Sequence, residues 1–408
     1  MELLTFIVLS ITLGALAVTI SSSLVLRLYH ALAIRRLERY QRKVSDWLTG
    51  YVVGARDDPP PSPTRNRFQR AVMGHNLGGL ASELKGEASG RLASLFEDYG
   101  LVDAACRDLG SHRPLLRIRA ADALGSMHVD RAVPQLREGL RHKDARLRLA
   151  CGHALAELGE VDELPAIIFA LREAEAPPGE IAEILLRFGL PATEYLRGVL
   201  RQDPDDVTRR LAAAALGDIR ALEGLPELRQ ALSRPDDELV ATAARALGRL
   251  GEVTAADDLI RLLRSDRTWF VHVAAANAVG ALDTPVAAPT LAKALAAESW
   301  DLRDAAARAL VKLGVAGFNA VLSELDELPD RAVAHYAGVL DMTDDLDSVI
   351  ARAAEGDLPT ERFVRRSVAA SVRVRLTEIA AGNGDHVEFA GRLLRHAPAH
   401  APVGAPTT

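Results

Sequence analysis

Aromatic residues are scarce in this sequence. They make up 4% of its 408 residues, although hydrophobic residues make up 49%. Alanine and leucine supply most of the apolar content instead, which favours helix over sheet. No long run alternates valine, isoleucine, threonine or tyrosine with polar residues, as a half-buried strand does. We therefore predict an all-α protein that is long enough to bury a large core.

Cysteine is equally rare, and the chain carries no disulfide framework. The two cysteines, Cys106 and Cys151, show no pairing pattern. We predict that both are buried thiols that behave as small apolar side chains.

The motifs of the common catalytic sites are also missing. There is no phosphate-binding glycine loop, no dinucleotide fingerprint and no serine elbow. His396 and His400 are four residues apart, but Pro398 breaks the helical geometry that a metal pair would use. We expect no catalytic residue, no cofactor and no metal site, and we expect that the protein is not an enzyme.

The charge is distributed unevenly along the chain. The formal net charge is −6, yet residues 1–50 carry six basic and three acidic side chains. The rest of the chain is therefore acidic. An acidic surface repels phosphates, so we expect no nucleic-acid partner.

A long uncharged segment lies near the beginning of the chain. Leu3–Leu26, "LLTFIVLSITLGALAVTISSSLVL", contains no charged residue. A helix of this length covers a hydrocarbon core of about 30 Å. The six basic residues follow the segment rather than precede it, which favours an uncleaved anchor with the body in the cytoplasm. We predict a single-pass membrane protein with a cytoplasmic C-terminal body.

The composition predicts four parts. Residues 1–53 form the anchor and a basic juxtamembrane helix, and residues 54–67 form a linker whose consecutive prolines favour an extended spacer. Residues 68–382 form the folded body. Residues 383–408 form a C-terminal segment with a disordered Pro/Ala-rich tail.

The folded body repeats one sequence motif with a period of 30–32 residues. The repeats align on an apolar anchor residue, which is Leu124, Leu155, Leu185, Leu216, Leu247, Val279, Leu310 or Leu340. An alanine pair commonly stands four and three residues before the anchor, as in Ala212/Ala213 and Ala243/Ala244. A second apolar helix follows, often with proline in its first turn, and an aspartate suited to an N-cap starts the next repeat. One such helix pair cannot bury its apolar face, but stacked copies can.

These phrases resemble the HEAT-repeat family, in particular the short alanine-rich repeats of the phycobilisome-lyase type. "DARLRLACGHAL" (144–155) and "DLRDAAARAL" (301–310) carry most of the family pattern D-x-x-V-R-x-x-A-A-x-A-L-G. The resemblance implies an α-solenoid of about eight to ten helical hairpins. The third repeat, "APPGEIAEILLRFGL", departs from the pattern through Pro177 and Pro178, which predicts a kink or bulge there.

A polar column stands seven residues before several anchors. It comprises Arg117, Arg148, Arg209, His272 and Arg303. One interpretation is a stripe that binds an acidic partner. The resemblance favours a structural ladder instead, in which Arg148 pairs with Asp144 and Arg209 pairs with Asp205.

Two tryptophans occupy matching positions in this aromatic-poor chain. Trp269 and Trp300 stand ten residues before their anchors, at the starts of helices in neighbouring repeats. Aromatic side chains often dominate protein interfaces, but they also pack between repeats. We predict that they contact a protein partner, with the polar column as the next candidate.

The function that these patterns favour is binding. We predict a membrane-anchored scaffold that presents a repeat surface to a protein partner of unknown identity. One alternative is a chromophore-lyase-like enzyme, which the resemblance suggests but for which no nucleophile is evident. Another is a regulatory subunit of a membrane enzyme complex.

Overall fold

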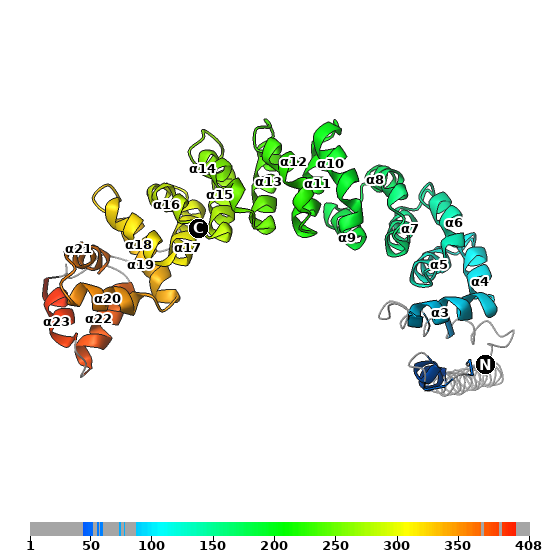
Figure 1. Cartoon of the computed structure of the whole chain (residues 1–408), viewed down its shortest axis with the longest axis horizontal. Helices are drawn as coiled ribbons and strands as arrows, with labels where there is room; N and C mark the ends of the chain where they lie inside the picture. The colour runs from blue at the N-terminus through cyan, green and yellow to red at the C-terminus, as the bar shows by residue number, and fades with distance from the viewer. Residues whose placement is uncertain are drawn as a thin grey trace, which may run out of the picture. The chain divides into compact units, whose positions relative to one another are not determined.

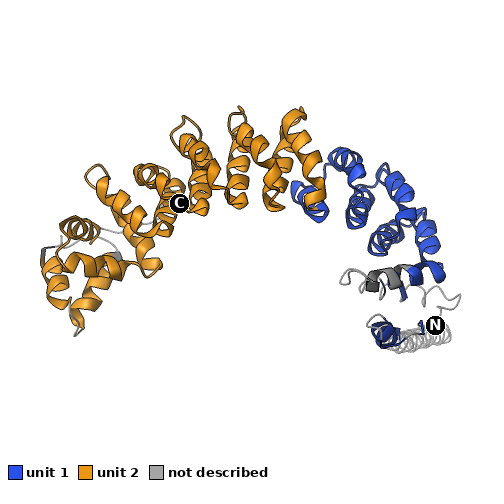
Figure 2. Ribbon diagram, in the orientation of Figure 1, with its two compact units in different colours: residues 1–188 blue, residues 189–408 orange. Residues whose placement is uncertain are grey.

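The computed structural model describes residues 44–51, 55–56, 58–59, 73–74, 77, 87–368, 371–382 and 386–396. Over these residues the chain is helical and contains no strand, as predicted. It divides into two compact units, residues 1–188 and 189–408 (Figure 2). The division falls at the end of the helix in the irregular third repeat.

Several predicted features lie outside the described residues. They are the Leu3–Leu26 span, nearly all of its basic flank, most of the linker at 54–67 and the tail from residue 397. Within the described ranges, no helix has the length and apolarity that crossing a bilayer requires.

Unit 1 consists of short helices joined by tight turns (Figure 1). Its elements are α3 (Glu87–Asp98), α4 (Leu101–Leu109), α5 (Pro114–Ser126), η1 (Asp130–Ala132), α6 (Val133–Gly139), α7 (Ala145–Leu158), η2 (Val161–Glu163), α8 (Leu164–Glu173) and α9 (Pro178–Phe188).

Unit 2 continues the same alternation. It contains η3 (Leu190–Ala192), α10 (Thr193–Gln202), α11 (Asp206–Asp218), η4 (Leu222–Gly224), α12 (Leu225–Ala231), α13 (Asp237–Leu250), η5 (Val253–Ala255), α14 (Ala256–Leu263), α15 (Trp269–Leu282), η6 (Pro285–Ala287), α16 (Ala288–Ala294), α17 (Trp300–Lys312), α18 (Gly314–Ser323), α19 (Asp330–Met342), α20 (Leu346–Ala354), α21 (Leu358–Ser367), α22 (Ser371–Ala381) and α23 (Val387–His396).

Each regular repeat is a long first helix, a 3-10 turn and a shorter second helix. Within each unit the first helices pack against one another, as α5 does with α7 and as α11, α13, α15 and α17 do in sequence. This stacking is the predicted α-solenoid. All eight anchor residues and the alanine pairs at 120/121, 212/213, 243/244, 275/276 and 306/307 are buried.

The glycine that follows an anchor explains why the first helices come so close. A Cβ atom on Gly217 would lie 2.6 Å from the Cα of Ala246 on the next first helix. Gly125 faces Ala154 in the same way, and a Cβ on Gly280 would lie 2.7 Å from the Cβ of Ala309. The glycine of one repeat therefore receives the alanine that precedes the anchor of the next.

The predicted helix starts are confirmed. The side chains of Asp144, Asp205, Asp236 and Ser299 accept hydrogen bonds from backbone N–H groups in the first turns of α7, α11, α13 and α17. Pro134, Pro165, Pro226 and Pro289 lie at the beginnings of second helices, where a missing N–H costs little.

The cysteine prediction holds for one residue of the two. Cys151 is buried, and its Sγ atom fills the space above Gly139, where a Cβ would lie 2.4 Å away. Burial raises the pKa of the Cys151 thiol to about 12. Cys106 is only half-buried, although burial raises the pKa of its thiol as well.

The repeat pattern changes near the C-terminal end, where a tyrosine takes the place of a core alanine. Tyr336 stands four residues before the anchor Leu340, where earlier repeats carry alanine, and it is fully buried. Its ring lies 6.0 Å from that of Phe363, which in turn lies 5.3 Å from Phe318. Helices α18, α19 and α21 therefore share an aromatic core.

Candidate partner-binding surface

Trp269 is the first residue of α15. The preceding repeat holds the loop before it in place. The Arg267 guanidinium lies 2.6 Å from the Asp237 carboxylate at the start of α13. Thr268, which precedes Trp269, donates its hydroxyl to the same carboxylate at 2.7 Å. The hydrogen bonds from Arg267 and then Thr268 lower the pKa of Asp237 below its usual value. The loop before Trp269 is thus held against the start of α13, and the indole belongs to the residue that follows this loop.

Trp300 is the first residue of α17, one repeat further on. The ring lies edge-on to His335 of α19, with 5.8 Å between the ring centroids. His335 Nε2 lies 3.3 Å from Asp304 of α17, and Asp304 also pairs with Arg308 at 2.7 Å. Trp300 is therefore oriented by a neighbouring side chain but is not covered by it.

Both indole rings face solvent. Trp269 is 53% exposed and Trp300 is 58% exposed. Because α15 and α17 pack against each other, the two rings lie at the same end of neighbouring helices. Both tryptophans remain accessible to a partner, and each ring also touches one neighbouring ring, that of Phe270 or His335. We call this pair the tryptophan edge.

His335 contacts the Trp300 ring and is largely shielded from solvent. Burial is the largest influence on this residue and lowers the pKa of His335, although the charge of Asp304 opposes it. A histidine with a depressed pKa in the folded state stabilises the fold while it is neutral. That stability is lost as the pH falls below the unfolded value of about 6.5.

We therefore expect the wild-type protein to lose more thermal stability than His335→Gln when the pH is lowered from about 7.5 to about 5.5. Melting curves at several pH values measure this difference. The matched control is His112→Gln, which replaces an exposed imidazole. A His335→Gln profile parallel to that of the wild type would contradict the assignment.

The polar column serves mainly to join repeats. Four of its members bond to backbone carbonyl oxygens six or seven residues earlier, in the loop that precedes their own helix. These contacts are Arg117 to Ser111 at 2.9 Å, Arg148 to His142 at 2.6 Å, His272 to Ser265 at 3.0 Å and Arg303 to Ala297 at 2.8 Å. The column therefore clamps the turn between consecutive repeats.

The predicted partners of the column need correction. Arg148 does not pair with Asp144. Besides its bond to His142, it donates to the carbonyl oxygen of Ala170, at 3.0 Å. Asp144 caps α7 and pairs instead with Arg117 of the preceding repeat, at 3.6 Å. Arg209 forms its ion pair with Asp206, the neighbour of the predicted Asp205. Both predicted pairs are therefore wrong: Asp144 pairs with the arginine of the preceding repeat, and Arg209 pairs with the residue after the cap.

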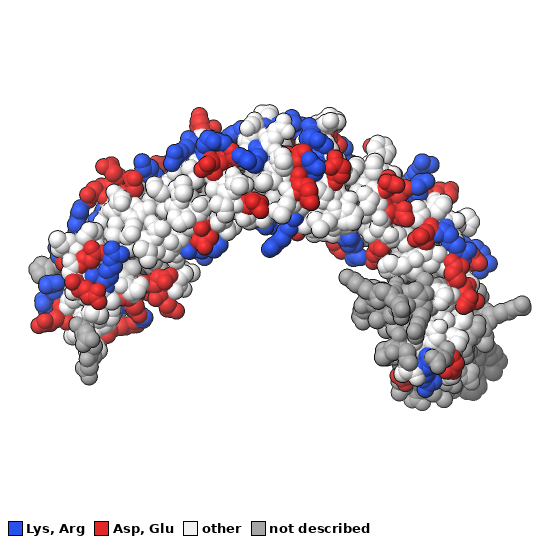
Figure 3. Space-filling model, in the orientation of Figure 1, with Lys and Arg blue, Asp and Glu red and all other residues white. Residues whose placement is uncertain are grey.

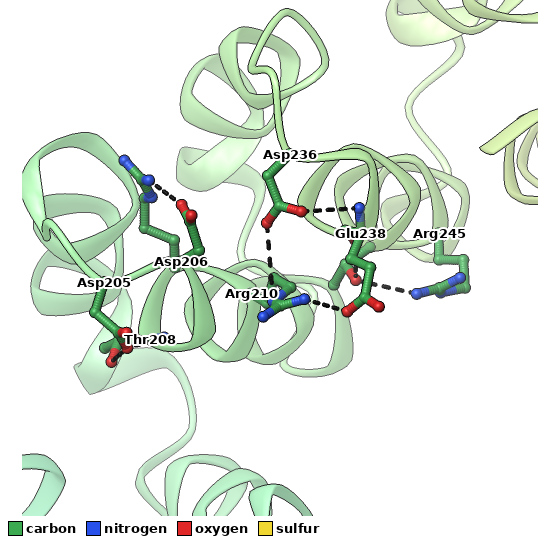
Figure 4. A network of polar contacts seen from close by, with 9 residues as sticks. Asp205, Asp206, Thr208, Arg210, Asp236, Glu238 and Arg245 are labelled. Atoms are coloured by element: carbon green, nitrogen blue, oxygen red, sulfur yellow. Dashed lines mark hydrogen bonds and ion pairs between the residues drawn. The ribbon is translucent and has the colours of Figure 1, made fainter. Parts of the chain in front are cut away.

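The capping aspartates link the repeats a second time. Asp236 caps α13 through the N–H of Glu238 and also lies 3.8 Å from Arg210 of α11, which pairs with Glu238 as well (Figure 4). The pairing of Arg117 with the capping residue Asp144 in unit 1 has the same form. These two caps are thus held by an arginine from the repeat before them.

A further ladder of ion pairs, from one second helix to the 3-10 turn or the second helix of the next repeat, was not predicted. Arg197 makes two hydrogen bonds of 3.1 Å to the buried carboxylate of Glu227, and Arg137 binds the buried Glu163. The hydrogen bond from Arg197 lowers the pKa of Glu227 despite its burial. Pairs of arginine and acid about one repeat apart are the sequence signal that could have revealed this ladder.

One group in the described part of the chain has the residue types of a metal site. The ligand atoms of His153, Glu180 and Glu183 lie within 4.8 Å of one another. However, the Arg187 guanidinium lies 3.2 Å from Glu183 and would repel a cation. The group is therefore poorly suited to hold a metal ion.

Comparison with known proteins identifies the repeats. Residues 103–186 and 193–278 match the sequence model of HEAT repeats. The repeats found in the sequence are thus similar to HEAT repeats over these stretches. The chain has no significant match among curated proteins.

Solved structures offer only distant similarity. An engineered protein is 18% identical, with a TM-score of 0.33, and the match covers 86% of this chain and 98% of that one. The complex of CpcE and CpcF of phycocyanin lyase from Nostoc sp. PCC7120 is 22% identical, with a TM-score of 0.28, and the match covers 60% and 94%. The karyopherin Kap121p bound to the extreme C-terminus of the protein phosphatase Cdc14p is 13% identical, with a TM-score of 0.43, and the match covers 82% and 46%. These similarities carry no functional argument.

Proposed function

We propose that this HEAT-repeat protein is a membrane-anchored scaffold that recruits a protein partner to the inner face of a membrane. The observation that carries the proposal is the tryptophan edge, because two half-exposed indole rings on neighbouring helices form a surface typical of interface hot spots. A HEAT-repeat scaffold fits a protein-binding role. The polar column is the less favoured surface, because its donors already bind backbone carbonyl oxygens.

The anchoring half of the proposal rests on the uncharged run Leu3–Leu26 and the basic residues after it. A segment of this length and apolarity is suited to span a bilayer once. Tethering would raise the local concentration of a bound partner at the membrane. The protein would act by binding alone, with its C-terminal body in the cytoplasm and without catalysis.

Deleting residues 1–26 is expected to move the protein, together with the proteins bound to it, from the membrane to the soluble fraction. Fractionation after a high-salt wash measures this, because salt removes electrostatic association but not a spanning helix. An unrelated membrane-spanning segment in place of Leu3–Leu26 should restore both the protein and its bound proteins to the membrane.

Two outcomes would contradict the proposal. If the shortened chain still sediments with washed membranes, the run Leu3–Leu26 is not the anchor. If the shortened chain becomes soluble while the proteins that it binds stay on the membrane, it does not recruit them.

A further inference from the structure

Each repeat of unit 2 from η3 to α18 exposes one large aliphatic side chain at the turn that follows a first helix. These side chains are between 51% and 72% exposed, and they belong to Leu190, Leu222, Val253, Val286 and Val315. Each is the first or second residue of its 3-10 turn, or of α18. We call them the aliphatic row.

Packing of the repeat itself does not require these side chains. The residue that each 3-10 turn buries is its third, a small alanine or glycine such as Ala255 or Gly224. In unit 1 the corresponding turns differ, since η1 begins with Asp130 and the first residue of η2, Val161, is half-buried. The aliphatic row is thus a feature of unit 2 rather than of the repeat in general.

The spacing of the row suits one backbone conformation. Helices α11, α13, α15 and α17 pack against one another in sequence, so the turns that follow them, with Leu222, Val253, Val286 and Val315, lie along one edge of unit 2 (Figure 1). Neighbouring packed helices are about 10 Å apart. A polyproline II segment has three residues per turn and rises about 3.1 Å per residue, so every third side chain returns to the same side after about 9 Å. A β-strand would point every third side chain to the opposite face.

The charges beside the row indicate the charge that a bound partner should carry. Glu223, Glu252, Asp257 and Asp283 lie within four residues of the row and form no ion pair in the described part of the chain. Two bases near the row, Arg220 and Lys312, are likewise without an ion pair, whereas Arg249 is neutralised by Asp218 at 2.8 Å, so the unpaired acids outnumber the unpaired bases. Lys and Arg side chains are interspersed with Asp and Glu side chains over the face of the molecule that Figure 3 shows.

We propose that the aliphatic row binds an extended basic segment of a partner protein, in the polyproline II conformation and with an apolar residue at every third position. The apolar side chains of the segment pack between the exposed aliphatic side chains, and its lysines or arginines face the four carboxylates. This surface is separate from the tryptophan edge. Trp269 and Trp300 begin α15 and α17, whereas the row follows the opposite ends of the first helices.

A peptide-binding measurement tests this proposal with the full-length chain in detergent. The probe is a fluorescently labelled twelve-residue peptide, four repeats of Leu-Lys-Pro, and the readout is fluorescence anisotropy. We expect saturable binding that weakens by about tenfold or more between 50 and 300 mM salt. Val253→Asp with Val286→Asp should weaken it by at least about tenfold, because it places charge in the contact. Val374→Asp is the matched control, since Val374 is equally exposed but lies in α22.

The controls distinguish this surface from the tryptophan edge. Trp269→Ala with Trp300→Ala should leave peptide affinity unchanged. Glu223→Lys with Glu252→Lys should weaken binding even if the valine variant is destabilised. The proposal is overturned if the peptide does not bind, if a peptide of the same composition with its four leucines adjacent binds equally well, or if neither pair of substitutions changes the affinity.

Discussion

Gly217→Ala is expected to destabilise the protein by about 1–3 kcal/mol, although alanine is the better helix former. The added methyl group would lie 2.6 Å from the Cα of Ala246, which is backbone and cannot rotate away. Helices α11 and α13 would have to separate, and the buried alanines between them would lose contacts. The cost of this separation exceeds the gain in helix propensity.

Gly198→Ala provides the matched control. Gly198 lies inside α10 and has no neighbouring atom within 4 Å of the position of a Cβ. The same substitution there should be neutral or stabilising by up to about 1 kcal/mol, because only the propensity term remains. Thermal or denaturant unfolding of both variants gives the comparison. Equal stability of the two variants would mean that α11 and α13 do not approach as closely as the structure describes.

The sequence predicted the fold well because the repeat pattern alone indicates helix pairs that must stack. Residues such as Leu216, Ala212 and Ala213 recur at fixed distances, and a helix pair with this pattern can only bury its apolar face against another copy. The N-caps and the prolines of the second helices were also predictable, since each depends on local backbone geometry. All of these features are set within one repeat.

Contacts between repeats were harder to predict. Which arginine meets Asp144 depends on how far one helix is rotated against the next, and the sequence does not state this rotation. The close approach at Gly217 was missed for the same reason, since its partner, Ala246, lies on another helix. The exposure of Trp269 and Trp300 also depends on packing. The sequence alone therefore did not decide whether these residues contact a partner or pack between repeats.

The aliphatic row shows a further limit. Leu222 and Val286 stand next to buried residues in the sequence, Val253 stands two residues before one, and all three look like ordinary apolar positions. Only the 3-10 turns, which direct these side chains outward while burying the third residue, distinguish them.

The second large effect concerns the partner. Trp269→Ala with Trp300→Ala is expected to weaken partner binding by about 2 kcal/mol or more for each ring, roughly thirtyfold per substitution. Because more than half of each ring is exposed, the fold should keep its helical signal and its melting temperature. The matched control is Phe169→Ala, which removes an exposed aromatic side chain from α8 in the other unit.

The most direct test of the scaffold proposal is therefore the recovery of bound proteins from detergent-solubilised membranes by the full-length chain and these variants. We predict that the wild type and Phe169→Ala recover the same partner, and that the double tryptophan variant loses it while melting at the wild-type temperature. Undiminished recovery by a folded double variant would contradict the account, and a large loss of its stability would show that the two rings serve packing instead.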